Sequence, residues 1–324
     1  MHAGKFPNLK HGGRTVSVQK TTTKHSQITI EQQLHWHGNI ESVWQEQLQL
    51  NHPTEELSVL KAHFMCNVDE TGVMANLGSI KVMGDLSKRK QEKNTDDCRD
   101  SISIVRIGNA AGSSGPWIFL ASGKRMTVKP LQNLEANFGA PSGSKVIMSP
   151  SAYMTDETWM TVVPFLSKGI RTMPIICEHP NWWVVLTLDG FGSHVNVTEA
   201  QKIFHEHKIF VVKEEGDTSA VNQPYDQSVA KADKANILDL LDQIRFKLGV
   251  IDKWDLIGIC CNALNKVGKD AWISFFKRVN LLHPDYRVDF VEWLKRIDGS
   301  RQCGERFFVK EHGSAQITTS KVPF

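Results

Sequence analysis

Apolar runs alternate with polar segments along this chain, and their lengths predict strands first and helices afterwards. The runs of strand length cover residues 62–68, 101–107, 117–120, 146–148, 182–188 and 209–212. A glycine-rich stretch at 109–115 separates the second run from the third and predicts a hairpin connection. We expect the first three strands to pair as an antiparallel meander, and the strand at 62–68 to end at Asp69.

Apolar residues at helical spacing predict the remaining elements. The predicted helices cover residues 155–168, 196–207, 227–248, 253–266, 269–280 and 286–297, and a helix-like pattern lies within 31–61. Thr155 is a suitable cap for the first of these, and Pro164 is expected to kink it or end it early. The later strands alternate with helices, which predicts parallel pairing through right-handed crossovers.

This order of elements indicates an α/β fold with a mixed sheet flanked by helices. We divide the chain into a basic, polar N-terminal segment with one possible helix (1–60), an α/β domain (61–248) and a helical C-terminal extension with a frayed tail (249–324). Its 324 residues are 40% hydrophobic and 23% charged, so a sizeable core is expected. The net charge of +3 permits DNA binding without arguing for it.

The cysteines and the N-terminus bear on the compartment. None of the six cysteines forms a CxxC pair or has zinc-type spacing with histidine, so reduced thiols are expected. We find no signal-peptide pattern at the N-terminus and no apolar run long enough for a membrane span. The expected location is the nucleus if the source is eukaryotic, and otherwise the cytoplasm, without membrane contact.

Three aspartates stand at the ends or beginnings of predicted elements. Asp69 and Asp189 each follow an apolar, strand-like run, and Asp226 follows a Gln-Pro turn and precedes a helix. If the two strands are parallel neighbours, both carboxylates emerge at the sheet edge that ligands favour. Carboxylates from three separate elements suit two divalent cations, which prefer oxygen ligands and promote phosphoryl transfer.

Each aspartate also has a plain structural interpretation. Asp69 could occupy a turn, and Asp226 could cap the following helix. Asp189 is harder to explain, because a carboxylate after so apolar a strand is costly unless it is solvated or bound to a metal. Asp233 lies two helical turns beyond Asp226, too far to share a metal comfortably, and is not expected to be a ligand.

Three further residues are candidates for supporting roles around the carboxylates. Glu70 should lie on the opposite side of an extended chain from Asp69, where a supporting role is favoured over direct ligation. His194 could orient a water or contact a phosphate, or be an ordinary surface histidine. Gln223 is expected to shape the turn that aims Asp226.

The ordered motifs resemble the DDE superfamily endonuclease domain of pogo/jerky-type transposases, relatives of the mariner group. The resemblance covers residues 60–240 and rests on Asp69-Glu70, on Asp189-Gly190 with Ser193-His194, and on Gln223-Pro224-Tyr225-Asp226. It implies an RNase H-like fold and a metal-dependent DNA endonuclease and strand transferase active in transposition. Asp69, Asp189 and Asp226 would hold two Mg²⁺ or Mn²⁺ ions.

The sequence also departs from that family. The interval between the first two aspartates is long, and no helix-turn-helix module is recognised before Asp69, so target recognition is expected to be lost or supplied elsewhere. DNA is the expected partner, and a homodimer is a possible form. Three alternatives stay open: a domesticated or decayed transposase-derived binding module without catalysis, a nuclease for RNA or hybrids, and an α/β interaction protein with chance acids.

Overall fold

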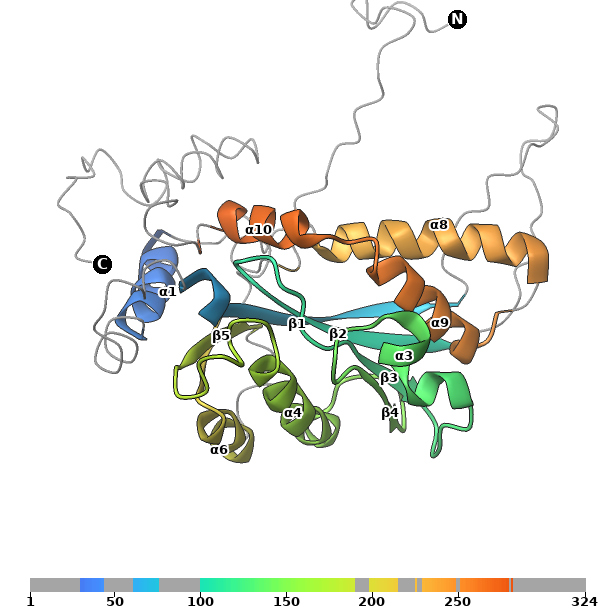
Figure 1. Cartoon of the computed structure of the whole chain (residues 1–324), viewed down its shortest axis with the longest axis horizontal. Helices are drawn as coiled ribbons and strands as arrows, with labels where there is room; N and C mark the ends of the chain where they lie inside the picture. The colour runs from blue at the N-terminus through green and yellow to red at the C-terminus, as the bar shows by residue number, and fades with distance from the viewer. Residues whose placement is uncertain are drawn as a thin grey trace, which may run out of the picture.

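The fold is a mixed sheet between two layers of helices (Figure 1). The computed structural model describes residues 30–43, 61–75, 100–189, 198–214, 225, 229–248, 251–279 and 281. The strands are β1 (Met65–Met74), β2 (Ser101–Asn109), β3 (Ile118–Ser122), β4 (Lys145–Ser149), β5 (Val184–Leu188) and β6 (Ile209–Lys213). They form one six-stranded sheet in the order β4-β3-β2-β1-β5-β6.

The pairing directions follow the sequence prediction. β1 and β2 are antiparallel, as are β2 and β3, which confirms the meander of the first three strands. β1 pairs parallel with β5, and β5 pairs parallel with β6. The edge strand β4 lies parallel to β3. The expected class, a mixed α/β sheet flanked by helices, is therefore confirmed.

Helices cover both faces of this sheet, because every strand except the edges must bury two sets of side chains. The described α-helices are α1 (Ile30–Val43), α3 (Leu134–Phe138), α4 (Asp156–Arg171), α6 (Thr198–Glu206), α8 (Ala230–Leu248), α9 (Lys253–Leu264) and α10 (Lys269–Arg278). α4 and α6 lie on one face, and α8, α9 and α10 lie on the other (Figure 1). Within these residues, no helix has both the length and the apolar character that crossing a bilayer requires.

Alternation along β1 divides its side chains between the two layers. Cys66 and Val68 join the core formed with α4 and α6. Met65 joins the core formed with α1 and α10, and Val73 joins the core formed with α8 and α9. The odd-numbered residues of β1, among them Asn67 and Asp69, therefore belong to the face covered by α8 and α10.

The structure corrects two predicted boundaries. β1 does not end at Asp69 but continues to Met74, because β2 pairs with it as far as Met74 opposite Ser101. α4 does not end early at Pro164 but continues to Arg171. Proline removes one backbone donor, but the side chains of Leu166 and Ile170 are fully buried and hold the rest of the helix against the sheet.

Candidate active site

Asp69 and Asp189 lie side by side where the parallel pairing of β1 with β5 ends. The parallel register of β1 and β5 ends with Val68 opposite Leu188, and the next residue on each strand is one of these aspartates. Neighbouring strands are about 4.8 Å apart, so the two carboxylates start from adjacent points of the sheet. Both residues are partly exposed, unlike the apolar strand residues that precede them.

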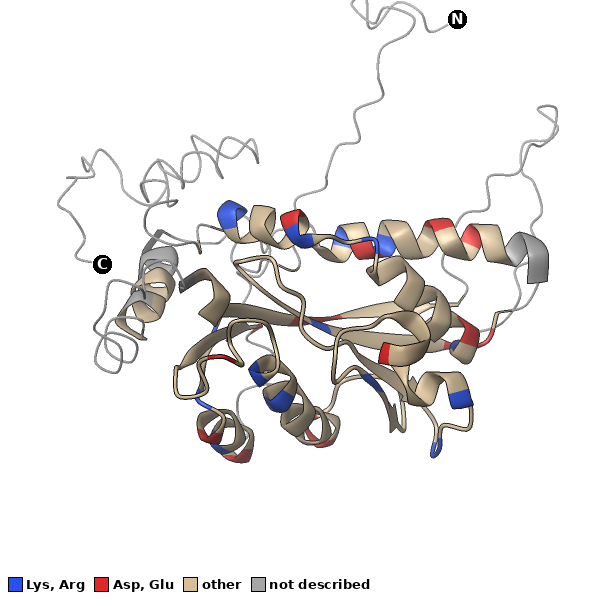
Figure 2. Cartoon of the chain, in the orientation of Figure 1, with Lys and Arg blue, Asp and Glu red and all other residues tan. Residues whose placement is uncertain are grey.

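The carboxylate of Asp69 is oriented by its own backbone. Its Oδ1 atom accepts a hydrogen bond from the backbone N–H of Glu70, with an N···O distance of 2.7 Å. Across the antiparallel ladder, Asp69 stands opposite Arg106 of β2. Figure 2 shows that most of the sheet is tan, with acidic and basic positions near its middle. Asp69 and Arg106 are thus an acidic and a basic residue in neighbouring positions of a sheet with few charged residues.

Glu70 shares in the crowding of negative charge at this edge. Burial and, secondly, the negative charge of Asp189 together raise the pKa of the Glu70 carboxyl to about 7. Like charges in a partly buried site disfavour simultaneous ionisation, and a bound cation removes that penalty. Asp69, Glu70 and Asp189 therefore form an edge where positive charge would be stabilising.

Asn67 fixes the neighbouring segments to this edge, and sequence reasoning missed it. Its fully buried amide donates through Nδ2 to the Thr187 carbonyl oxygen at 3.2 Å and to Thr187 Oγ1 at 3.1 Å. Its Oδ1 accepts from the backbone N–H of Tyr225 at 3.1 Å. The sequence feature that could have identified Asn67 is a side-chain amide inside an apolar run, because an amide is costly to bury unless it is hydrogen-bonded.

Three of the predicted site residues, Asp226, His194 and Gln223, lie outside the described residues. The residue that precedes Asp226, Tyr225, is described and is fully buried. Among the residues that the structure describes, no group of three or more His, Cys, Asp or Glu side chains is placed to hold a metal ion. The structure thus brings two of the predicted ligands together and fixes the backbone next to the third.

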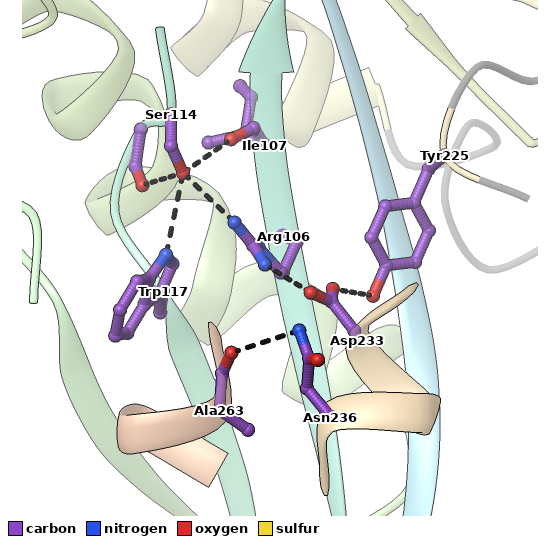
Figure 3. Close-up of polar contacts among 9 residues, drawn as sticks. Arg106, Ile107, Ser114, Trp117, Tyr225, Asp233, Asn236 and Ala263 are labelled. Atoms are coloured by element: carbon purple, nitrogen blue, oxygen red, sulfur yellow. Dashed lines mark hydrogen bonds and ion pairs between the residues drawn. The ribbon is translucent and has the colours of Figure 1, made fainter. Parts of the chain in front are cut away.

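A buried polar network lies beside this site (Figure 3). Arg106 Nη1 donates to Asp233 Oδ1 at 2.6 Å, and the Tyr225 hydroxyl donates to Asp233 Oδ2 at 3.2 Å. Burial raises the pKa of Asp233, the charge of Arg106 and the two hydrogen bonds lower it, and the net result is a pKa of about 6. Asp233 is thus ionised at neutral pH and accepts a hydrogen bond on each oxygen.

Tyr225 serves this network as a donor. Burial raises the pKa of its hydroxyl well above the ordinary value, and the negative charge of Asp233 raises it further. The hydroxyl therefore stays protonated and keeps its hydrogen bond to Asp233. Asp233, which is not a predicted metal ligand, is the buried partner of Arg106 and Tyr225.

The donor set at the edge fits a hard divalent cation. The register of β1 and β5 makes Asp69 and Asp189 neighbours, and Mg²⁺ and Mn²⁺ prefer their carboxylate oxygens to thiolates. Cys66, the nearest cysteine along β1, is buried in the core on the opposite face. These residues therefore suit the metals that the sequence suggests.

The sequence of this chain matches no protein-family model and no curated protein. Several solved structures resemble its fold, among them three Mos1 structures. A pre-cleavage Mos1 transpososome is 10% identical with a TM-score of 0.49, and the match covers 90% of this chain and 67% of that one. A Mos1 mariner paired end complex with Mn is 9% identical with a TM-score of 0.49, over 90% of this chain and 66% of that one.

The third structure is the catalytic domain of Mos1 mariner transposase. It is 7% identical with a TM-score of 0.41, and the match covers 81% of this chain and 97% of that one. The chain thus spans about two thirds of the length of the two complexes. At these identities and TM-scores, the similarities assign neither a family nor an activity to it.

Proposed function

We propose that this chain cleaves phosphodiester bonds in DNA with divalent metal ions held by Asp69, Asp189 and Asp226. The observation that carries this proposal is the register of β1 and β5, which puts two carboxylates next to each other at one sheet edge. Asp226 is the proposed third ligand, because it follows a residue that is hydrogen-bonded to Asn67. The sequence motifs further suggest a DDE transposase of the pogo/jerky type.

The chain's own residues would bind and position the reacting groups. The Glu70 N–H orients the Asp69 carboxylate through a hydrogen bond. Asn67 is hydrogen-bonded to Thr187 of β5, and this would keep Asp189 beside Asp69. Bound Mg²⁺ or Mn²⁺ would supply Lewis-acid stabilisation of the scissile phosphate and lower the pKa of the attacking water. The same site would allow a released 3′-hydroxyl to attack a second strand, as transposition requires.

The remaining predicted residues have subsidiary proposed roles. His194 would orient the attacking water or contact a phosphate, and Gln223 would shape the turn before Asp226. We assign the reaction to residues 61–248 and treat residues 249–324 as a helical extension of that domain. A DNA substrate implies a nuclear location in a eukaryotic cell.

The test is plasmid nicking by the purified full chain with Mn²⁺ or Mg²⁺. We expect metal-dependent nicking that Asp189→Asn abolishes. The matched control is Asp239→Asn in α8, which removes the same charge from a side chain that is 64% exposed. Undiminished nicking by Asp189→Asn would refute the proposed site. RNA and hybrid substrates, assayed in parallel, decide which nucleic acid the site prefers.

A folded protein that binds metal without nicking DNA would support the alternative of a decayed, transposase-derived binding module. Gel-shift binding to DNA under the same conditions would then show whether DNA is still its partner. A protein that binds neither metal nor DNA would support the interaction-protein alternative.

A further inference from the structure

Arg106 stands directly opposite Asp69 in the antiparallel ladder of β1 and β2. Residues opposite each other in such a pair share one face of the sheet, with Cβ atoms about 4.5–5.5 Å apart. Arginine forms strong, often bidentate pairs with carboxylates at such distances. A guanidinium on Asp69 would cover oxygens that a cation needs, and it would also repel the cation.

The structure directs the guanidinium elsewhere (Figure 3). Arg106 Nη1 donates to Asp233 at 2.6 Å, and Nη2 donates to Ser114 Oγ at 3.3 Å. The guanidinium carbon also lies 5.5 Å from the centre of the Trp117 ring and 5.7 Å from that of Trp272. Cation–π contacts of this kind favour the observed position of the arginine over alternatives.

Asp233 is the charged partner in this arrangement. Its side chain is fully buried, as is that of Arg106, so neither charge is screened by water. The Tyr225 hydroxyl occupies the second oxygen of Asp233 and leaves the first for Arg106. The positive charge of Arg106 is therefore neutralised on the side of the guanidinium that faces α8.

We propose that Asp233 is a positioning residue that keeps Arg106 away from Asp69, so that Asp69 can bind a divalent cation. The cation itself rests on the function proposed above. Without the Asp233 carboxylate, Arg106 turns to Asp69, the acidic residue directly opposite it in the ladder. Arg106 then competes with the metal for Asp69.

The first test measures Mn²⁺ affinity of the full chain by isothermal titration calorimetry. Asp233→Asn should weaken binding on the order of tenfold, the effect of one nearby charge on a carboxylate. The double variant Arg106→Leu/Asp233→Leu should restore affinity to within about threefold of wild type, because apolar residues can replace a buried ion pair. A purely structural role for Asp233 would leave both variants weak.

A second comparison covers the case in which Asp233→Asn does not fold. Arg106→Lys/Asp233→Leu puts a cation opposite Asp69 without its α8 partner, and it is compared with Arg106→Leu/Asp233→Leu. The lysine variant should bind Mn²⁺ about tenfold more weakly than the leucine variant. Equal affinities of the two would overturn the role of Asp233.

The second test needs no metal. A double-mutant cycle with Asp69→Asn and Arg106→Leu, measured by urea unfolding, gives the coupling between the two side chains. We expect this coupling to be larger in the Asp233→Asn background than in wild type, and an unchanged coupling would overturn the inference. A wild-type chain that binds no Mn²⁺ overturns the proposed function instead, so the two failures are distinguishable.

Discussion

The backbone N–H of Tyr225 donates to the side-chain oxygen of Asn67, a residue 158 positions earlier, at 3.1 Å. The side-chain amide of Asn67 also donates, through its Nδ2, to the carbonyl and hydroxyl oxygens of Thr187 in β5. The buried side chain of Asn67, two positions before Asp69, thus joins β1 to β5 and to the residue that precedes Asp226. The relative positions of the candidate ligands depend on a residue that is not itself acidic.

Asn67→Asp should be strongly destabilising although the two side chains have the same shape. It replaces the donor that faces the Thr187 carbonyl by an acceptor, so we expect a loss of about 2–4 kcal/mol in the free energy of unfolding. Urea unfolding at pH 7 measures it. Thr187→Val is the control, since it removes the hydroxyl but keeps the carbonyl, and it should cost about 1 kcal/mol. Equal losses for the two variants would contradict this role of Asn67.

The raised pKa of Glu70 predicts how stability depends on pH. The folded chain binds the Glu70 proton more tightly than the unfolded chain does. Protonation of Glu70 therefore contributes fully to the free energy of unfolding below pH 4.5, and this contribution is lost as pH rises towards 7. Glu70→Gln has no carboxyl to ionise, so its free energy of unfolding should not fall in this way. Without divalent ions, its stability relative to wild type should therefore increase by about 1–3 kcal/mol between pH 4.5 and 7. Urea unfolding at several pH values measures the difference.

Two further measurements check that interpretation. Glu206→Gln removes an exposed carboxylate from α6 and should leave the pH profile of wild type unchanged. Saturating Mg²⁺ should flatten the wild-type profile, because a cation beside Asp189 favours the ionised form of Glu70. A Glu70→Gln profile parallel to that of wild type would refute the assignment.

Gly108→Ala should destabilise the face that carries the site. Gly108 pairs with Asn67 in the β1/β2 ladder, and a Cβ at this position would collide with the buried ring of Trp272. Trp272 stacks on Tyr225 with the ring centres 6.1 Å apart, so the collision disturbs both residues. We expect a loss of about 1–3 kcal/mol, as for an overpacked core.

The control for Gly108 is a second glycine on the adjacent strand. Gly72 of β1 has nothing within 4 Å of an added Cβ, so Gly72→Ala should not create a collision. Thermal unfolding compares the two variants. Similar midpoints for both would show that the Trp272 ring moves aside without cost.

Divalent ions should stabilise the folded chain through the two adjacent carboxylates. At a free Mn²⁺ concentration 100 times the dissociation constant, the expected gain is about 2.7 kcal/mol. The thermal midpoint of wild type and of Asp239→Asn should rise accordingly, whereas that of Asp69→Asn and Asp189→Asn should not. A full shift in Asp189→Asn would show that the ion binds elsewhere.

The sequence was sufficient for the sheet and for the meeting of the two aspartates. Strands such as β5 are buried on both faces and stand out as continuous apolar runs, and the alternation with helices fixes parallel pairing. The extent of β1 was not predictable in this way. Residues 69–72 are polar and resemble a turn, but the backbone ladder with β2 extends through them whatever their side chains.

The hydrophobic periodicity of the sequence could not predict the Arg106–Asp233 ion pair. The two residues are 127 positions apart, and each fits the pattern of its own element as an ordinary charged position. Only the packing of α8 over β2 makes them a buried pair. Asn67, by contrast, was visible in the sequence as a polar residue in an apolar run, but its partners Thr187 and Tyr225 follow from tertiary structure alone.

The central place of β1 in the sheet has a consequence for how the chain folds. β1 to β4 can associate during synthesis while the residues of β5 have not yet been made, so Asp69 is in place first. β5 then brings Asp189 against Asp69 and Glu70 in a parallel pairing, which is a slow kind of step. Repulsion among the carboxylates opposes this late pairing of β5 with β1. Divalent ions would therefore accelerate refolding as well as stabilise the folded chain.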